Sequence, residues 1–282
     1  MAKLLKQTYG FAKEVMDNFS KDRGSLFAAA IAFYGLISII PLLLLGIAVL
    51  GYILGSESAR HQVITFVRNF IPVGREELER NLVLLSKQSS ILGGIGILAL
   101  LWTGSQVFVI LQHAINTALG STKRIGFLRA RATALAMVII IGILFILSVG
   151  MSSLADIIRG FDIKLLGKEL VDFQLAWNVF FGILVPFVIS VIAFTLIYKY
   201  LPLADVDLRG PILGGLTAGI LFEIAKYGFQ WYVTNIANFN AVYGTLGGVV
   251  ILVLWIYYTS LIGVLGAEVA SVYIERTKQK EG

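Results

Sequence analysis

Residues 24–56 read GSLFAAAIAFYGLISIIPLLLLGIAVLGYILGS, and this stretch contains no Asp, Glu, Lys or Arg. A helix needs about 20 apolar residues to cross a bilayer, and this stretch is longer. Similar uncharged runs recur at 88–122, 132–155, 173–198 and 227–267. Over the whole chain 57% of residues are hydrophobic and 14% are charged, whereas soluble domains carry about 25% charged residues. The sequence therefore predicts a membrane protein that crosses the bilayer several times.

The expected fold class is an all-α integral membrane protein, a bundle of six transmembrane helices with short amphipathic interfacial helices. The last uncharged run is about twice the length of one span, and its polar segment 234–244 separates the end of one span from the next. The expected spans are about 26–54, 91–118, 132–155, 175–199, 210–235 and 243–272. Because the connections are short, we expect residues 1–282 to form a single transmembrane domain without a soluble catalytic domain.

Basic residues are unevenly divided between the connections. With the N- and C-termini in the cytoplasm, fourteen Lys and Arg residues lie on the cytoplasmic side and eight on the opposite side. This division obeys the positive-inside rule, so we expect both termini to be cytoplasmic. It also explains most of the net charge of +6 without a nucleic acid partner, and leaves membrane lipids as the expected surroundings.

Two segments outside the spans have amphipathic patterns. Residues 1–23 place Tyr9 and Met16 on one helical face and lysines elsewhere, which predicts a cytoplasmic helix on the membrane surface. Residues 57–88 contain two apolar stripes separated by Pro72, which predicts an extracytoplasmic helical connection. Such helices cover the ends of a bundle or serve as docking surfaces.

Small residues recur at helical spacing in the last two spans. Gly215 and Gly219 form a GxxxG pattern, and Gly263 and Ala267 form a related one. In lipid, small residues allow the backbones of two helices to approach closely. We expect these residues to pack helices of the same chain, with a dimer face as the alternative.

Charged residues inside a bilayer are costly, so each one is a candidate functional residue. Glu223 follows residue 210 by about 13 positions, which at 1.5 Å per residue places it roughly 20 Å deep, near the midplane. Tyr227 and Gln230 lie on the same helical face, with Lys226 close to it. These four residues form a predicted polar stripe. In the alternative interpretation, Glu223 and Lys226 only neutralise each other and hold helices together.

Two other spans carry polar residues on one face. Gln106 and His113 share a face of the second span, and Tyr257 and Glu268 share a face of the last. His113 is interpreted either as a proton relay or as a hydrogen-bonded structural residue. The candidate substrate or proton path therefore consists of Glu223, Lys226, Tyr227, Gln230, Gln106, His113, Tyr257 and Glu268.

Glu268 has a second interpretation, because it is expected near the cytoplasmic end of its span. Arg131 and Lys199 are predicted at the same surface. Glu268 is therefore expected to form an ion pair with one of these bases, which is a structural role.

The sequence contains no recognisable catalytic constellation. It has no cysteine, and its two histidines, His61 and His113, are predicted on opposite sides of the membrane. The phosphate loop GxxxxGK[ST] and the hydrolase motifs HExxH and GxSxG do not occur. We therefore expect a protein that is not an enzyme, with no catalytic residues, no cofactor and no metal.

Four stretches resemble the YihY/virulence factor BrkB family of bacterial inner-membrane proteins, which was formerly labelled ribonuclease BN. They are AAAIAFYGLISIIPLLLLGIAVLG at 28–51, LWTGSQVFVILQHAINTALG at 101–120, YKYLPLADVDLRGPILGGLTAGILFEIAKYGFQWYV at 198–233 and YGTLGGVVILVLWIYYTSLIGVLGAEVASVY at 243–273. The resemblance implies six spans and a multi-pass location in the bacterial cytoplasmic (inner) membrane. It supplies no established catalytic residues. The sequence departs from the usual family pattern at Leu203-Ala204-Asp205, where an Asn commonly occurs.

The resemblance implies a role in the cell envelope. The leading hypothesis is a transporter or flippase-like protein for an envelope lipid or other amphipathic substrate, in which Glu223 and Lys226 bind a headgroup or carry a coupling proton. The alternative is a non-transporting membrane scaffold for envelope assembly, with 3–19 and 57–87 as docking surfaces. Its partners would be an envelope protein or further copies of the chain. A membrane-bound hydrolase or nuclease is the least favoured hypothesis.

Overall fold

The computed structural model describes residues 2–54, 89–121, 126–160, 180–202, 206–235 and 247–281. These residues are almost entirely helical, and none of them forms a strand. The predicted extracytoplasmic connection at 57–88 lies outside the described residues, as does the departure at 203–205. The all-α class predicted from composition is confirmed.

Within the described residues, six helices are long and apolar enough to cross a membrane, as predicted. The helices in chain order are α1 (Ala2–Lys21), α2 (Gly24–Leu54), α5 (Ser89–Ala118), α6 (Phe127–Gly160), the π-helical turn η1 (Phe180–Leu184), α8 (Val185–Tyr200), α9 (Arg209–Asn235) and α11 (Gly247–Glu281). The turn η1 leads directly into α8, so the two form one span. The cytoplasmic location of the termini stays a prediction.

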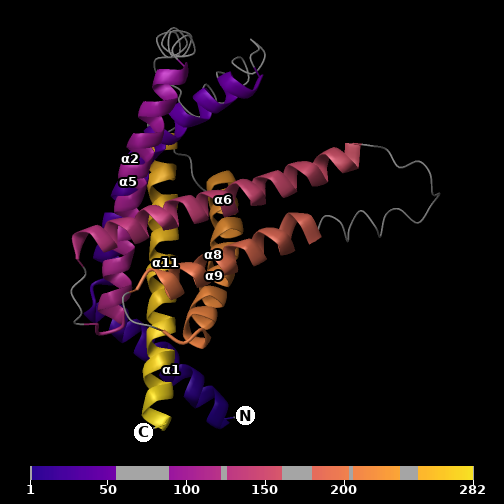
Figure 1. The fold of residues 1–282 in the computed structure, drawn as a ribbon. Coiled ribbons are helices and arrows are strands. Elements are labelled where there is room, and N and C mark those ends of the chain that lie inside the picture. Colours follow the sequence, from indigo (N-terminus) through magenta and orange to yellow (C-terminus); the bar gives the residue numbers. More distant parts are fainter. Residues whose placement is uncertain are drawn as a thin grey trace, which may run out of the picture.

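Helix α11 is the centre of the arrangement. It contacts α1, α2, α5, α8 and α9, and in Figure 1 it runs through the middle of the bundle. Helices α2 and α5 lie side by side, α6 packs on α5 and α8, and α8 packs on α9. The main core therefore forms where α2, α5, α8 and α11 meet.

Glycines allow α8, α9 and α11 to approach closely. A Cβ atom added at Gly219 would lie 2.6 Å from Val191 of α8, and one added at Gly215 would collide with Thr195 of the same helix. A Cβ atom at Gly214 would lie 2.5 Å from the carbonyl oxygen of Gly266 in α11. The prediction that the GxxxG pattern packs helices of one chain is confirmed.

Helix α1 is attached to the end of α11. Val15 packs with Val269 and Val272 in a small apolar cluster. Beside this cluster, Arg276 forms an ion pair with Glu14, and its guanidinium carbon lies 5.2 Å from the ring centroid of Phe11. One face of the amphipathic helix is thus held against the bundle rather than left free.

Candidate functional site

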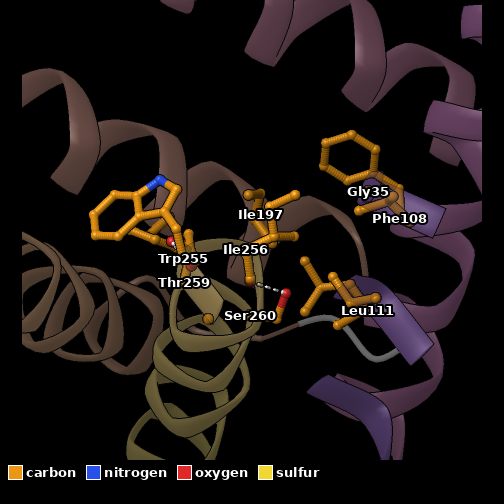
Figure 2. A pocket seen from close by; sticks show the side chains of 12 residues that line it. Gly35, Phe108, Leu111, Ile197, Trp255, Ile256, Thr259 and Ser260 are labelled. Carbon is orange, nitrogen blue, oxygen red and sulfur yellow. Dashed lines mark hydrogen bonds between the residues drawn. The ribbon is translucent and has the colours of Figure 1, made fainter. Parts of the chain in front are cut away.

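A pocket of about 290 Å³ lies between four membrane-spanning helices, α2, α5, α8 and α11. Figure 2 shows its walls from close by. The lining residues are Ile31, Gly35, Val107, Phe108, Leu111, Phe194, Ile197, Trp255, Ile256, Thr259, Ser260 and Gly263. Most of them are only partly buried, so the pocket is not sealed inside the bundle.

The two hydroxyl groups in the pocket wall are engaged with their own helix. Thr259 Oγ1 donates to the carbonyl oxygen of Trp255 at 2.9 Å, and Ser260 Oγ donates to that of Ile256 at 2.7 Å, the bond drawn in Figure 2. The remaining lining side chains are aliphatic or aromatic. The pocket therefore presents a nearly hydrocarbon surface, which favours an apolar ligand.

Aromatic contacts connect this pocket to α9. The ring centroid of Trp255, in the pocket wall, lies 5.8 Å from that of Phe222 and 5.1 Å from that of Phe229. Phe194, also in the wall, lies 6.3 Å from Phe222 by the same measure. Phe222 and Phe229 are seven residues apart on α9, and Lys226 lies between them on the same side of the helix. The pocket and the predicted polar stripe are thus neighbours.

We use the name α9 polar stripe for Glu223, Lys226, Tyr227 and Gln230. Lys226 Nζ lies 2.6 Å from Glu223 Oε2, and 5.0 Å from the ring centroid of Tyr227. The side chain of Glu223 is 13% exposed and that of Lys226 33% exposed, and both Tyr227 and Gln230 are exposed. Oε1 of Glu223 is buried and has no hydrogen-bond partner, whereas Oε2 is engaged by the ammonium group of Lys226. The stripe therefore combines a paired carboxylate and cation with two exposed polar side chains.

Gln106 and His113 lie away from this stripe. Gln106 Oε1 accepts a 2.8 Å hydrogen bond from Arg131 Nη1 of α6, and the guanidinium carbon of Arg131 lies 4.3 Å from the ring centroid of Trp102. Gln106 thus positions Arg131 between α5 and α6. His113 is exposed on α5 and does not line the pocket. Tyr257 is partly buried and packs against the main core.

Glu268 is buried but is not paired as expected. Its residue surface is 1% exposed, and its Oε2 has no hydrogen-bond partner. Arg131 is held by Gln106, and Lys199 Nζ donates to the carbonyl oxygen of Val206 at 2.6 Å. The expected ion pair with one of these bases is therefore wrong, because the packing of α6 and α8 directs both bases elsewhere.

Glu268, a candidate from the sequence, and three buried residues that were not candidates form a second polar region, which we call the buried polar layer. Its members are Gln112, Tyr198, Glu268 and Ser271. Gln112 Nε2 donates to the carbonyl oxygen of Leu201 at 2.6 Å, Tyr198 OH to that of Gly263 at 2.7 Å, and Ser271 Oγ to that of Ala118 at 2.5 Å. Each of these bonds joins two different segments of the bundle.

The signal for this layer in the sequence is weak. Gln112 is next to His113 in the same uncharged run, and periodicity does not tell which of the two faces the core. Within the described ranges, no three His, Cys, Asp or Glu residues are close enough to hold a metal ion.

Comparison with known proteins identifies related membrane proteins. A UPF0761 membrane protein of Psychrobacter sp. is 26% identical over 282 residues, which cover 96% of this chain and 51% of that protein. A UPF0761 membrane protein of Alkalilimnicola ehrlichii is 28% identical, with 94% of this chain and 58% of that protein covered. The one of Aeromonas salmonicida is 29% identical, with 95% and 90% covered. The chain thus spans little more than half the length of the first two relatives.

No solved structure matches the protein significantly. The relatives are named as membrane proteins, and the six apolar helices agree with a multi-pass membrane protein. The family model for virulence factor BrkB matches residues 15–282, nearly the whole chain, so this protein belongs to the virulence factor BrkB family.

Proposed function

We propose that this protein binds an amphipathic envelope lipid in the membrane and moves it between the two leaflets. The observation that carries the proposal is the apolar pocket between α2, α5, α8 and α11. A pocket bounded by membrane-spanning helices receives its ligands from the lipid phase, and its nearly hydrocarbon walls select an acyl chain over a water-soluble metabolite.

The size of the pocket fits part of a lipid rather than a whole one. Ligand pockets occupy about 300–1,000 Å³, and this pocket of about 290 Å³ is at the lower limit. In our proposal a segment of one acyl chain lies in the pocket, between Phe108 and Trp255, while the headgroup stays outside it.

The α9 polar stripe is the proposed headgroup site. Lys226 supplies a cation that attracts a phosphate group, and Glu223, when its ion pair with Lys226 opens, supplies carboxylate oxygens that accept from an ammonium or hydroxyl group. The contacts of Trp255 with Phe222 and Phe229 place this stripe beside the pocket wall. The proposal needs no chemical reaction, so the protein acts as a transporter and not as an enzyme, without cofactor or nucleic acid.

The test is leaflet exchange of fluorescent phospholipids by the purified full chain in liposomes. Val107→Trp places a large ring in the pocket, whereas Leu98→Trp adds the same ring to an exposed position of the same helix. We expect Val107→Trp to slow exchange at least tenfold and Leu98→Trp to leave it unchanged. Equal rates for both variants would contradict the pocket assignment. No exchange by folded wild type with any headgroup would contradict transport and favour the scaffold.

A matched pair of variants tests the headgroup site. Glu223→Gln with Lys226→Met removes both charges together, so no unpaired charge is left in the membrane. We expect this double variant to fold normally but to lose its preference between zwitterionic and anionic phospholipids. An unchanged preference would show that the stripe does not contact headgroups.

A further inference from the structure

Glu268 differs from the other buried polar residues in the described part of the protein. These residues are Ser105, Gln112, Asn116, Ser260, Glu268 and Ser271, and Glu268 is the only carboxylic acid among them. It is 1% exposed, and its helical neighbours Val264 and Ala267 are 2% and 1% exposed. Glu268 is therefore almost completely withdrawn from water in this arrangement of the helices.

Among the residues that the structure describes, no basic side chain forms an ion pair with Glu268. The groups that raise the cost of a charge on it are Asp22, in the turn between α1 and α2, and Glu275 on α11, and both are acidic. On α8, Lys199 donates to the carbonyl oxygen of Val206, and on α5, His113 is exposed. An ionised carboxylate without a partner in such a place is very costly, so it becomes neutral instead.

Two buried acceptor atoms, one on α5 and one on α11, lack a hydrogen-bond donor. Gln112 Oε1 and Glu268 Oε2 are both buried acceptors without a donor, on α5 and α11, which contact each other. A protonated carboxyl group is a donor as well as an acceptor, whereas a carboxylate only accepts. A proton on Glu268 therefore turns one of these two unpaired acceptors of the buried polar layer into a donor.

We propose that Glu268 is a buried proton-binding site. A hydronium ion of the solvent gives its proton to Oε2, where an O–H bond forms, and is released as water, and the carboxyl group stays neutral while α5 and α11 enclose it. A metal cation is the less suitable occupant, because it needs several oxygen ligands and no three His, Cys, Asp or Glu side chains of the described residues are close enough to hold one. This site is independent of the proposed lipid transport.

Infrared spectroscopy of the purified full chain at neutral pH, in a detergent without ester or carboxyl groups, tests the proposal. A protonated carboxylic acid has a C=O stretching band that a carboxylate lacks. We expect this band in the wild type, its complete loss in Glu268→Gln, and its retention in Glu223→Gln and Glu14→Gln. Persistence of the band in Glu268→Gln, or its absence from the wild type, would overturn the proposal.

Two further measurements test the assignment of the band to Glu268 even if the Glu268→Gln variant does not fold. Labelling Glu carboxyl carbons with ¹³C in the Glu223→Gln background should shift the band, and no shift would assign the proton to another residue type. Exchanging K⁺ for Na⁺ should leave the band unchanged. Loss of the band in Na⁺ would show that a metal cation displaces the proton, and would overturn the assignment of the site to a proton alone.

Discussion

The buried polar layer and the α9 polar stripe contain the same kinds of side chain in opposite surroundings. In the layer, Gln112, Tyr198 and Ser271 donate to backbone carbonyl groups of other segments. In the stripe, Lys226 pairs with Glu223 of its own helix, and the other two members, Tyr227 and Gln230, are exposed. The layer therefore fixes the relative positions of helices, and the stripe does not.

This difference decides what each region can do. A buried hydrogen bond between helices cannot be given up for a ligand without leaving an acceptor unpaired, which costs about 1–3 kcal/mol. In the proposed function, Lys226 and Glu223 of the stripe exchange each other for a headgroup while the packing of α9 on α8 and α11 stays intact. The comparison predicts that substitutions in the layer change stability and that substitutions in the stripe change binding.

The largest effect is expected where backbone packing supports the layer. In Gly266→Ala the new Cβ atom would lie 2.8 Å from Ala218 and would collide with the hydroxyl group of Tyr198. Overpacking of this kind costs about 1–3 kcal/mol, and we expect the upper end because the Tyr198 hydrogen bond is also disturbed. The measurement is thermal unfolding of the purified protein in detergent.

Gly228→Ala is the matched control, because nothing lies within 4 Å of its added Cβ atom. Gly228 is exposed on α9, in the region of the stripe. Here alanine should stabilise the helix by up to about 1 kcal/mol. Equal melting temperatures for the two variants would show that the packing around Gly266 is not tight.

The spans were predictable because their signal is local and strong. Uncharged runs and the GxxxG pattern of Gly215 and Gly219 indicate six spans and close packing without knowledge of the neighbours. The site was less predictable, because a face that contacts lipid is as apolar as one that contacts another helix. Gln112 is 2% exposed and its neighbour His113 is exposed, yet the sequence analysis selected His113.

Partners far apart in the chain explain the rest. Gln112 bonds to Leu201, 89 positions later, and Ser271 bonds to Ala118, 153 positions earlier. The rotation of each helix about its own axis determines these contacts. The spacing of residues within one span does not indicate how that helix is rotated relative to its neighbours. The apolar pocket is formed by four helices in the same way, so no single motif indicates it.

An intermediate effect is expected from the hydrogen bond of Gln112. Gln112→Leu removes the donor to the carbonyl oxygen of Leu201 and leaves that buried acceptor unpaired, which costs about 1–3 kcal/mol. Gln230→Leu makes the same substitution at an exposed position of the stripe and should change stability by less than about 0.5 kcal/mol. Thermal unfolding in one detergent compares the two variants. Similar losses would mean that the stripe is as structural as the layer.

The smallest effect on stability is expected from the ion pair between α1 and α11. This pair distinguishes the effect of burial from the effect of joining two helices, which the layer and the stripe do not separate. The layer is both buried and interhelical, whereas the ion pair of the stripe is only partly exposed and intrahelical. Glu14 and Arg276 belong to different helices, but their side chains are 38% and 35% exposed. If burial sets the cost, Glu14→Gln should lower stability by about 0.2–1 kcal/mol.

That loss should also disappear in about 1 M salt, where the Debye length is about 3 Å. Unfolding measured at low and high salt, with Lys6→Gln as an exposed control on α1, gives the answer. A loss as large as that of Gln112→Leu, unaffected by salt, would mean that the position of the partner matters more than burial. The contribution of each polar contact to stability would then depend on which helices the contact joins. The ion pair of the α9 stripe lies within one helix, so the stripe would still be the region where a ligand can bind without separating helices.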